Sequence, residues 1–226
     1  KSIDHILCKS DHALEIFSKI HPSCHFTGFT SSDLNNPGIP RRQNAILHLA
    51  GRSTLKGTET VLSLWKKHPE WPTLTLLQHK DNAPENVPEN VNLISDYLSD
   101  EDLVKLVNEH PIHLCPSLSE GWGHYIVEAM SCGALVITTD GPPMNELVAP
   151  DRGILVNAPK SEPRHLGTNF LVEPSALEAA IERALSMPED EHHHMSNTAQ
   201  QWASNNKRLF ESRFIGSLNS ILKNTA

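Results

Sequence analysis

The sequence predicts an α/β fold in which a parallel sheet carries helices on both faces. From Asn44 onward, short apolar runs alternate with amphipathic stretches of about three turns, which is typical of repeated strand–helix units. The apolar runs are nearly continuous in Ile, Leu and Val, as in strands that are buried on both sides. The chain has 226 residues, of which 38% are hydrophobic, and is long enough to bury the core of such a sheet.

The residues ahead of Asn44 predict a short strand–helix–strand segment followed by a linker. "DHILC" and "CHFTGF" predict strands, and "SDHALEIFSKI" between them predicts a helix capped by Ser10 or Asp11. The stretch "TSSDLNNPGIPRRQ" is rich in Ser, Asn, Pro and Gly, so it predicts a long loop or linker.

Strands and helices then follow one another in regular order. The predicted strands are "AILHLAG", "TLTLLQ", "VNLIS", "IHLCPS" and "ALVITT". The predicted helices are "KGTETVLSLWKKH", "DEDLVKLVNEH", a segment from about Gly123 to Ser131, and "PSALEAAIERALSM". No period is evident between Val156 and Pro174, which leaves a surface loop and a short hairpin as alternatives. From Pro188 onward the sequence predicts one or two further helices.

The charge balance argues against a nucleic-acid-binding protein, and the cysteines indicate the compartment in which the protein works. The chain carries 19 Lys and Arg against 27 Asp and Glu, so its net charge is −8 and it is a poor candidate for binding nucleic acid. Four cysteines without C-x-x-C spacing, of which Cys115 and Cys132 lie in apolar runs, predict a cytoplasmic protein with reduced thiols. No apolar run approaches the roughly 18 residues of a membrane helix, which leaves peripheral membrane association open.

Candidate site residues follow the predicted strands, because ligands of open α/β sheets bind outside the carboxyl ends of the strands. In "GRSTLKGTE", Gly51 allows a turn, while Arg52 and Lys56 stand just before a helix. An Arg fork and a Lys charge at such a junction are suited to hold a diphosphate. The alternative is a pair of solvated loop cations, and the spacing of a Walker A loop is absent.

Two glutamates flank a glycine-rich turn in "SEGWGHYIVEAM". Gly121 and Gly123 free the backbone, so amides at the helix start can face a phosphate. Glu120 in the turn is placed to accept hydrogen bonds from sugar hydroxyls, and Glu128 on the helix is placed to accept them from a ribose. The alternative is that Glu120 helps to cap the helix while Glu128 is solvated.

Two further patterns carry less weight. In "TTDGPPMNEL", Asp140 and Glu146 either face one cleft or belong to a tight proline turn with a helix cap. The three histidines at 192–194 lie in a predicted helix, where consecutive side chains point about 100° apart. They predict a solvated helix face and not a metal site.

These motifs resemble those of a known family. "PSLSEGWGHYIVEAMSCGALVITTD" resembles the signature of retaining glycosyltransferases with the GT-B fold: a strand, E-G-[FW]-G, a second Glu eight positions after the first, A-M-[AS]-C-G and another strand. "GRSTLKGTETVL" resembles the Arg/Lys phosphate loop of the same family. The resemblance spans residues 44–186, and "PPMNE" stands where the family usually has Gly-Gly before the later Glu.

The resemblance implies two Rossmann-like halves, of which the second binds a nucleotide-sugar donor. Residues 1–43 are then expected to form the end of an N-terminal acceptor domain and a crossover linker. Residues 44–190 are expected to form the Rossmann-like donor domain, and residues 191–226 the C-terminal helices. Most of the acceptor domain would lie outside this sequence, so a fragment and a naturally short protein are alternatives, and activity in isolation is an open question.

The resemblance also assigns roles in catalysis. Arg52 and Lys56 are expected to hold the diphosphate and Glu120 to contact the donor sugar, and these three are the expected catalytic residues. The resemblance also implies that no metal takes part. The "DED" at 100–102 matches the D-x-D signature of metal-dependent glycosyltransferases, but it opens a predicted helix, where Asp100 is a natural cap.

Five more residues are expected to contact the donor. By the resemblance, Glu128 binds the ribose, and the amides of Gly121, Trp122 and Gly123 lie near the sugar or the phosphate. The loop that contains Tyr97 is expected to meet the base. The donor is a substrate, so no cofactor is expected.

The leading hypothesis is the donor half of a glycosyltransferase. It would transfer a sugar from a UDP- or GDP-linked donor to a glycan or lipid-linked acceptor, with retention and without a metal. The alternative is a non-catalytic module that binds a nucleotide sugar and serves a partner chain. A nucleotide-sugar 2-epimerase is a third hypothesis, against which the presence of both glutamates argues.

Overall fold

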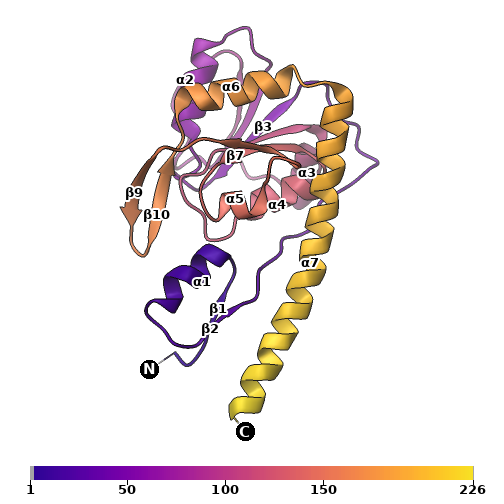
Figure 1. Cartoon of the computed structure of the whole chain (residues 1–226). Helices are drawn as coiled ribbons and strands as arrows, with labels where there is room; N and C mark the ends of the chain where they lie inside the picture. Colours follow the sequence, from indigo (N-terminus) through magenta and orange to yellow (C-terminus); the bar gives the residue numbers. More distant parts are fainter. Residues whose placement is uncertain (1–2, 226) are drawn as a thin grey trace.

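A six-stranded parallel sheet forms the centre of the chain in the computed structural model, which describes residues 3–225 (Figure 1). The strand order is β5-β4-β3-β6-β7-β8, and each neighbouring pair is parallel. The strands are β3 (Ile46–Gly51), β4 (Leu74–Gln78), β5 (Val91–Ile94), β6 (Ile112–Cys115), β7 (Leu135–Thr139) and β8 (Ile154–Val156). This architecture confirms the predicted α/β fold.

Helices cover both faces of the sheet, as predicted (Figure 1). One face carries α2 and α6, whose Trp65 and Leu177 are fully buried in one apolar cluster with Leu76 of the sheet. The other face carries α3, α4 and α5, and Met130 and Met144 are fully buried in a second cluster there. The helices are α2 (Thr58–Lys67), α3 (Asp100–Glu109), α4 (His124–Ser131), α5 (Met144–Leu147) and α6 (Pro174–Leu185).

The strand order reverses between β3 and β6. From β3 the chain adds β4 and β5 on one side, then crosses back through α3 to place β6 on the other side of β3. In open parallel sheets the loops after two such strands diverge and leave a crevice at the carboxyl edge, where ligands bind. The segments after Gly51 and after Cys115, which contain most of the expected site residues, lie at this edge.

A small N-terminal unit stands apart from the sheet. It consists of β1 (Ile6–Cys8), α1 (Asp11–Ser18) and β2 (Cys24–Phe26), and the two strands pair in parallel. Ser10 caps α1, because its Oγ accepts a hydrogen bond from the amide of Ala13 at 3.0 Å. This unit matches the strand–helix–strand segment that the sequence predicts.

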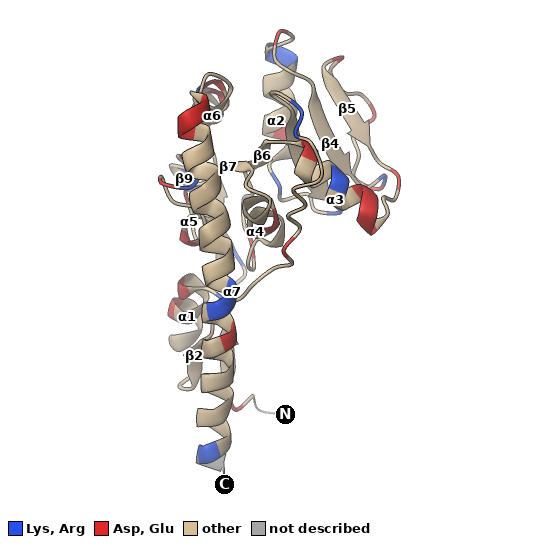
Figure 2. Cartoon of the chain, turned by 90° about the vertical axis from the view of Figure 1, so that its right-hand side faces the viewer, with Lys and Arg blue, Asp and Glu red and all other residues tan. Residues whose placement is uncertain are grey.

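One long helix, α7 (Glu189–Thr225), joins the two parts of the molecule. Figure 2 shows it running from α6 past α4 to α1 and β2. Ala199 and Ala203 are buried in the cluster that α4 forms, and Phe210 packs on Phe29 with 5.3 Å between ring centroids. Within the described residues, no helix is long and apolar enough to cross a membrane.

Several local features differ from the sequence-based prediction. The sequence analysis missed β8 and α5, which have only three and four residues and therefore show no period. The segment between Val156 and Pro174 is the hairpin alternative, with β9 (Lys160–Arg164) paired to β10 (Gly167–Leu171). Ser99 and not Asp100 caps α3, since its Oγ accepts from the amide of Asp102.

Candidate functional site

Two loops at the carboxyl edge of the sheet are joined by their backbones. The amide of Leu118, after β6, donates to the carbonyl of Leu55, after β3, at 2.8 Å. Gly57 adopts a left-handed conformation with φ +73°, and a Cβ there would lie 2.3 Å from the carbonyl oxygen of Pro116. The absence of a side chain at Gly57 therefore lets the two loops meet, which positions the residues that they carry.

We expect Gly57→Ala to lower the free energy of unfolding by about 2 kcal/mol or more. Left-handed backbone strain alone costs about 1–3 kcal/mol for a residue with a Cβ, and the close carbonyl of Pro116 adds to it. Urea denaturation measures the change. The control is Gly216→Ala in α7, where no atom lies within 4 Å of an added Cβ and helix propensity should stabilise the protein. Equal stability of both variants would contradict the close approach.

The loops bring Lys56 and Glu120 together as an ion pair. Lys56 Nζ lies 2.5 Å from Glu120 Oε1, and the side chains are only 16% and 13% exposed. The ammonium also lies 3.8 Å from the centroid of the Tyr125 ring, which adds a cation–π interaction. Lys56 is thus not the freely solvated cation of the alternative interpretation.

A chain of hydroxyl groups orients Glu120. Ser117 Oγ donates to Glu120 Oε1 at 2.6 Å and lies 2.6 Å from the hydroxyl of Tyr125. Because the Ser117 proton is used on the carboxylate, the Tyr125 phenol donates to Ser117 Oγ. Burial raises the pKa of Tyr125 well above its ordinary value, with smaller contributions from Cys115 and Glu120, so the phenol keeps its proton. The sequence analysis missed both Ser117 and Tyr125, although Ser117 directly follows a predicted strand.

Glu128 lies near this pair without joining it. It is half-buried on α4, and none of the described residues donates a hydrogen bond to its carboxylate. Burial raises the pKa of Glu128, while the charge of Lys56 opposes the shift. A half-buried carboxylate with open acceptor positions is suited to bind hydroxyl groups of a ligand.

The start of α4 carries no side-chain cap. Its N-cap is Gly123 in a left-handed conformation with φ +103°, so Glu120 does not cap the helix as the alternative interpretation has it. Trp122 is buried, packs edge-on against Phe29 and donates its Nε1–H to Ser31 Oγ at 3.3 Å. Its side chain therefore anchors the linker.

Arg52 and Tyr97 take no part in the contacts between Lys56 and Glu120. Arg52 is exposed, and its Nη2 lies 3.0 Å from Nε2 of His79 in the loop after β4. Tyr97, between β5 and α3, is 89% exposed. Of the expected residues, the structure thus brings Lys56 and Glu120 into contact, with Glu128 near the Lys56 charge, whereas Arg52 contacts His79 instead.

The buried His48 of β3 stabilises the strands that lead into the two loops of the site. Its Nδ1 donates to the carbonyl of Leu114 on β6 at 2.8 Å, so the neutral ring accepts at Nε2 from Thr58 Oγ1 at 3.0 Å. Complete burial lowers the pKa of His48 to about 4, which keeps the ring neutral. The regular pairing of β3 with β6 ends at Leu47 and His113, one residue earlier, so His48 ties the strands where they diverge.

The other carboxylates singled out in the sequence have structural surroundings. Glu146 accepts the amides of Asp11 and His12 at 2.8 and 2.9 Å, so it caps α1 of the N-terminal unit. Asp140 accepts a hydrogen bond from Asn145 Nδ2 at 3.0 Å. Glu146 therefore caps a helix 135 positions away in the chain, whereas α5, in which it lies, has no side-chain cap.

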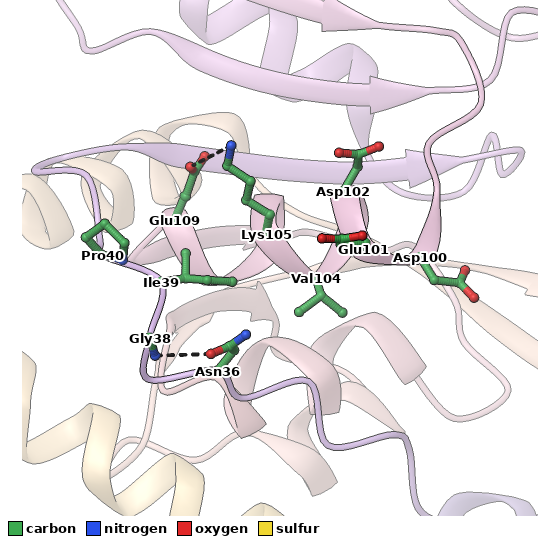
Figure 3. Close-up of a pocket in the computed structure, with 10 residues that line it drawn as sticks. All are labelled: Asn36, Gly38, Ile39, Pro40, Asp100, Glu101, Asp102, Val104, Lys105 and Glu109. Atoms are coloured by element: carbon green, nitrogen blue, oxygen red, sulfur yellow. Dashed lines mark hydrogen bonds and ion pairs between the residues drawn. The ribbon is translucent and has the colours of Figure 1, made fainter.

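A cavity of about 820 Å³ lies between the linker and α3, and Lys56 is not among the residues that line it. Figure 3 shows that Asp100, Glu101 and Asp102 spread around the start of α3 and do not converge. Lys105 and Glu109 of the same cavity pair with each other at 3.9 Å. Across residues 3–225, no three His, Cys, Asp or Glu side chains are grouped so that they could hold a metal.

The fold and the geometry together define a Rossmann-like α/β unit with a candidate site at its switch point. The sequence pattern of the family described as glycosyl transferases group 1 matches residues 29–202, so the chain belongs to this family. The expected GT-B fold is confirmed by the solved structures described next. None of the curated proteins that were compared matches the chain.

Solved glycosyltransferase structures share the fold over nearly the whole chain. A glycosyltransferase from Rickettsia africae has a TM-score of 0.75 at 16% identity, with 98% of this chain and 64% of that chain covered. Sucrose-phosphate synthase from Thermosynechococcus elongatus has a TM-score of 0.74 at 17% identity, with coverage of 100% and 60%. Anabaena HepE in complex with UDP-glucose has a TM-score of 0.72 at 16% identity, with coverage of 97% and 65%. The chain spans less than two thirds of each.

Proposed function

We propose that the chain binds the nucleotide-sugar donor of a retaining, metal-independent glycosyltransferase. The observation that carries the proposal is the Lys56–Glu120 pair at the switch point, with the open carboxylate of Glu128 nearby. Membership of the glycosyl transferases group 1 family supports it, as does the likeness to a protein crystallised with UDP-glucose. A UDP- or GDP-linked sugar is the proposed substrate.

Each residue has a chemical role in this proposal. A diphosphate competes with Glu120 for the Lys56 ammonium and lies near the uncapped start of α4, whose amides favour an anion. Glu120, released from Lys56, accepts hydrogen bonds from hydroxyls of the donor sugar. Glu128 accepts those of the ribose.

When the bond between the sugar and the diphosphate breaks, positively charged groups of the protein stabilise the leaving group, as a metal ion would in a metal-dependent enzyme. Negative charge grows on the leaving diphosphate, and Lys56 together with the amides of α4 stabilises it. Arg52 joins them once it leaves His79, since its long side chain is exposed and free to reorient. In this proposal Tyr97, in the loop after β5, covers the base.

We propose that the acceptor, a glycan or a lipid-linked sugar, binds to a further α/β domain that packs on the N-terminal unit. Two strands of three residues each do not form a stable parallel sheet alone, so we expect further strands to extend the sheet of β1 and β2. Exposed apolar side chains border this unit, among them Ile20 and, at 58% exposure, Ile215 of α7.

The four free cysteines agree with a cytoplasmic location.

The chain is expected to bind UDP or GDP equally well with Mg²⁺ and with EDTA. The reason is that Lys56, Arg52 and the start of α4 supply the positive charge for the diphosphate. Isothermal titration calorimetry measures the affinity under both conditions. Binding that disappears in EDTA would contradict the metal-free site.

Transfer separates the enzyme from a binding module. The chain, supplied with an acceptor domain, is incubated with labelled UDP-glucose, UDP-N-acetylglucosamine or a GDP-linked sugar. Appearance of label on a glycan or lipid acceptor supports the transferase. Binding of the donor without any transfer would favour the non-catalytic module, and an epimerised free sugar nucleotide would favour the epimerase.

A further inference from the structure

The two carboxylate oxygens of Glu120 have different surroundings. Oε1 accepts two donors, Lys56 Nζ at 2.5 Å and Ser117 Oγ at 2.6 Å. None of the described residues donates a hydrogen bond to Oε2, and this oxygen is not one of the fully buried atoms without a partner. Oε2 therefore keeps accessible surface and is the oxygen that a ligand can reach, whereas both lone pairs of Oε1 already have a donor.

Tyr125 fixes the direction of the Ser117 hydroxyl group. A serine hydroxyl has a single proton and can rotate about its Cβ–Oγ bond. The Tyr125 phenol donates to Ser117 Oγ at 2.6 Å, so the serine proton points away from the phenol and toward Glu120 Oε1. Ser117 is fully buried and Tyr125 is only 8% exposed, so bulk water has little access to these two bonds. Without the phenol, the serine proton would have no fixed direction.

Tyr125 also contacts the other member of the ion pair. The centroid of its ring lies 3.8 Å from Lys56 Nζ. The ring thus touches Lys56, while the hydroxyl group acts on Glu120 through Ser117. Because the two contacts use different parts of one side chain, a phenylalanine at this position would keep the first contact and lose the second.

The hydrogen bonds from Tyr125 to Ser117 and from Ser117 to Glu120 matter most when a diphosphate is bound. In the proposed function the diphosphate draws the Lys56 ammonium away from Glu120, which removes one of the two donors on Oε1. Ser117 is then the remaining donor among the described residues, and it keeps the carboxylate oriented. Orientation is important because a displacement of about 1 Å in a reacting site can lower the rate by about a hundredfold.

We infer that Tyr125 is a positioning residue for sugar transfer. Its hydroxyl group, acting through Ser117, holds Glu120 so that Oε2 accepts a hydrogen bond from a hydroxyl group of the donor sugar after Lys56 has turned to the diphosphate. The inference rests on the proposed function and adds a residue that touches neither the sugar nor the diphosphate.

Tyr125→Phe tests the inference, because it removes the hydroxyl group and keeps the ring beside Lys56. Kinetics are measured in the chain supplied with an acceptor domain, with the labelled UDP- or GDP-linked sugar that the unmodified protein transfers. The kcat is expected to fall about tenfold or more, while the KM of the donor and the Kd of the nucleoside diphosphate stay within about twofold. An unchanged kcat in a folded Tyr125→Phe protein would overturn the inference.

A double-mutant cycle separates positioning from a loss of stability. Ser117→Ala breaks the same connection at its other end, so it should lower kcat at least as much as Tyr125→Phe does. The double variant should match Ser117→Ala within about twofold, because the phenol has no serine left to act on. Losses that multiply in the double variant would contradict the inference. Ser117→Ala also keeps the test decisive if Tyr125→Phe fails to fold.

Thr75→Val is the matched control. Thr75 lies near the amino end of β4, is buried, and has its hydroxyl 2.9 Å from His110 Nε2, so the variant also removes a buried hydroxyl group. It should lower the Tm but leave kcat unchanged, and an equal loss of kcat would mean that Tyr125→Phe acts through stability alone.

NMR relaxation of ¹³C-labelled glutamate side chains tests the positioning in the chain itself. With UDP bound, the order parameter of the Glu120 side chain should be lower in Tyr125→Phe than in the unmodified chain. Equal order parameters would overturn the inference. A chain that does not bind UDP or GDP would instead refute the proposed function, so the two failures are distinguishable.

Discussion

Replacing Lys56 by alanine will weaken UDP binding about ten- to hundredfold. A charge-assisted hydrogen bond to a phosphate oxygen contributes roughly 1.5–3 kcal/mol, and Lys56 is the half-buried cation at the switch point. The affinity for uridine, which has no phosphate, should stay within about twofold, because uridine cannot use that charge. Calorimetry with UDP and uridine gives both values.

The matched control for Lys56 is Lys66→Ala. Lys66 is an exposed lysine in the last turn of α2, so its loss changes the net charge equally without touching the site. UDP affinity should be unchanged in this variant. If Lys56→Ala weakened UDP and uridine by the same factor, or if Lys66→Ala matched its effect, Lys56 would not lie at the diphosphate.

The two glutamates are expected to affect different steps. Glu128→Ala should raise the Kd of UDP about tenfold but leave the Kd of 2′,3′-dideoxy-UDP unchanged, because only UDP has ribose hydroxyls for the carboxylate to accept. Glu120→Gln should not weaken UDP binding and can strengthen it, since Lys56 is freed from its ion pair. In a chain that also carries an acceptor domain, Glu120→Gln should lower kcat about 100-fold, as expected for an interaction made mainly in the transition state.

Circular dichroism controls for folding in both glutamate variants. A loss of UDP affinity in Glu120→Gln that equals the loss in Glu128→Ala would contradict the division between sugar and ribose. If Glu128→Ala left the Kd of UDP unchanged and Glu120→Gln left kcat unchanged, both carboxylates would have only structural roles.

The sequence predicts the longer elements of this fold because each has enough residues to show a period. The apolar runs of β3, β4, β6 and β7 and the amphipathic α2 lie where the pattern places them. The three-residue β8 and four-residue α5 have no measurable period, so tertiary contacts decide them. The sequence left one or two helices open for α7, because polar residues run through the whole segment and no single apolar period extends along it.

The candidate site was predicted in part, and the misses have a physical cause. Spacing along the chain indicates that Lys56 and Glu120 follow strands that end at one edge, and the fold brings them within 2.5 Å. Spacing does not encode side-chain direction, so the turn of Arg52 toward His79 was not predictable. Ser117 and Tyr125 act through hydrogen bonds whose partners are known only once the chain is folded.

The continuous α7 links the position of the N-terminal unit to the packing of the helix on α4. The helix is fixed to α4 through Ala199 and Ala203, and ten residues further on Arg213 lies over the ring of Phe26 in β2. At about 1.5 Å per residue these contacts are about 15 Å apart, so tilting the helix by about 10° at α4 displaces the N-terminal unit by roughly 3 Å. A change in the tilt of α7 at Ala203 would therefore be magnified at the N-terminal unit, against the restraint of Glu146 on the amides of Asp11 and His12. Substitutions near Ala203 should alter how the N-terminal unit aligns with the Glu120 loop, even though they touch no ligand.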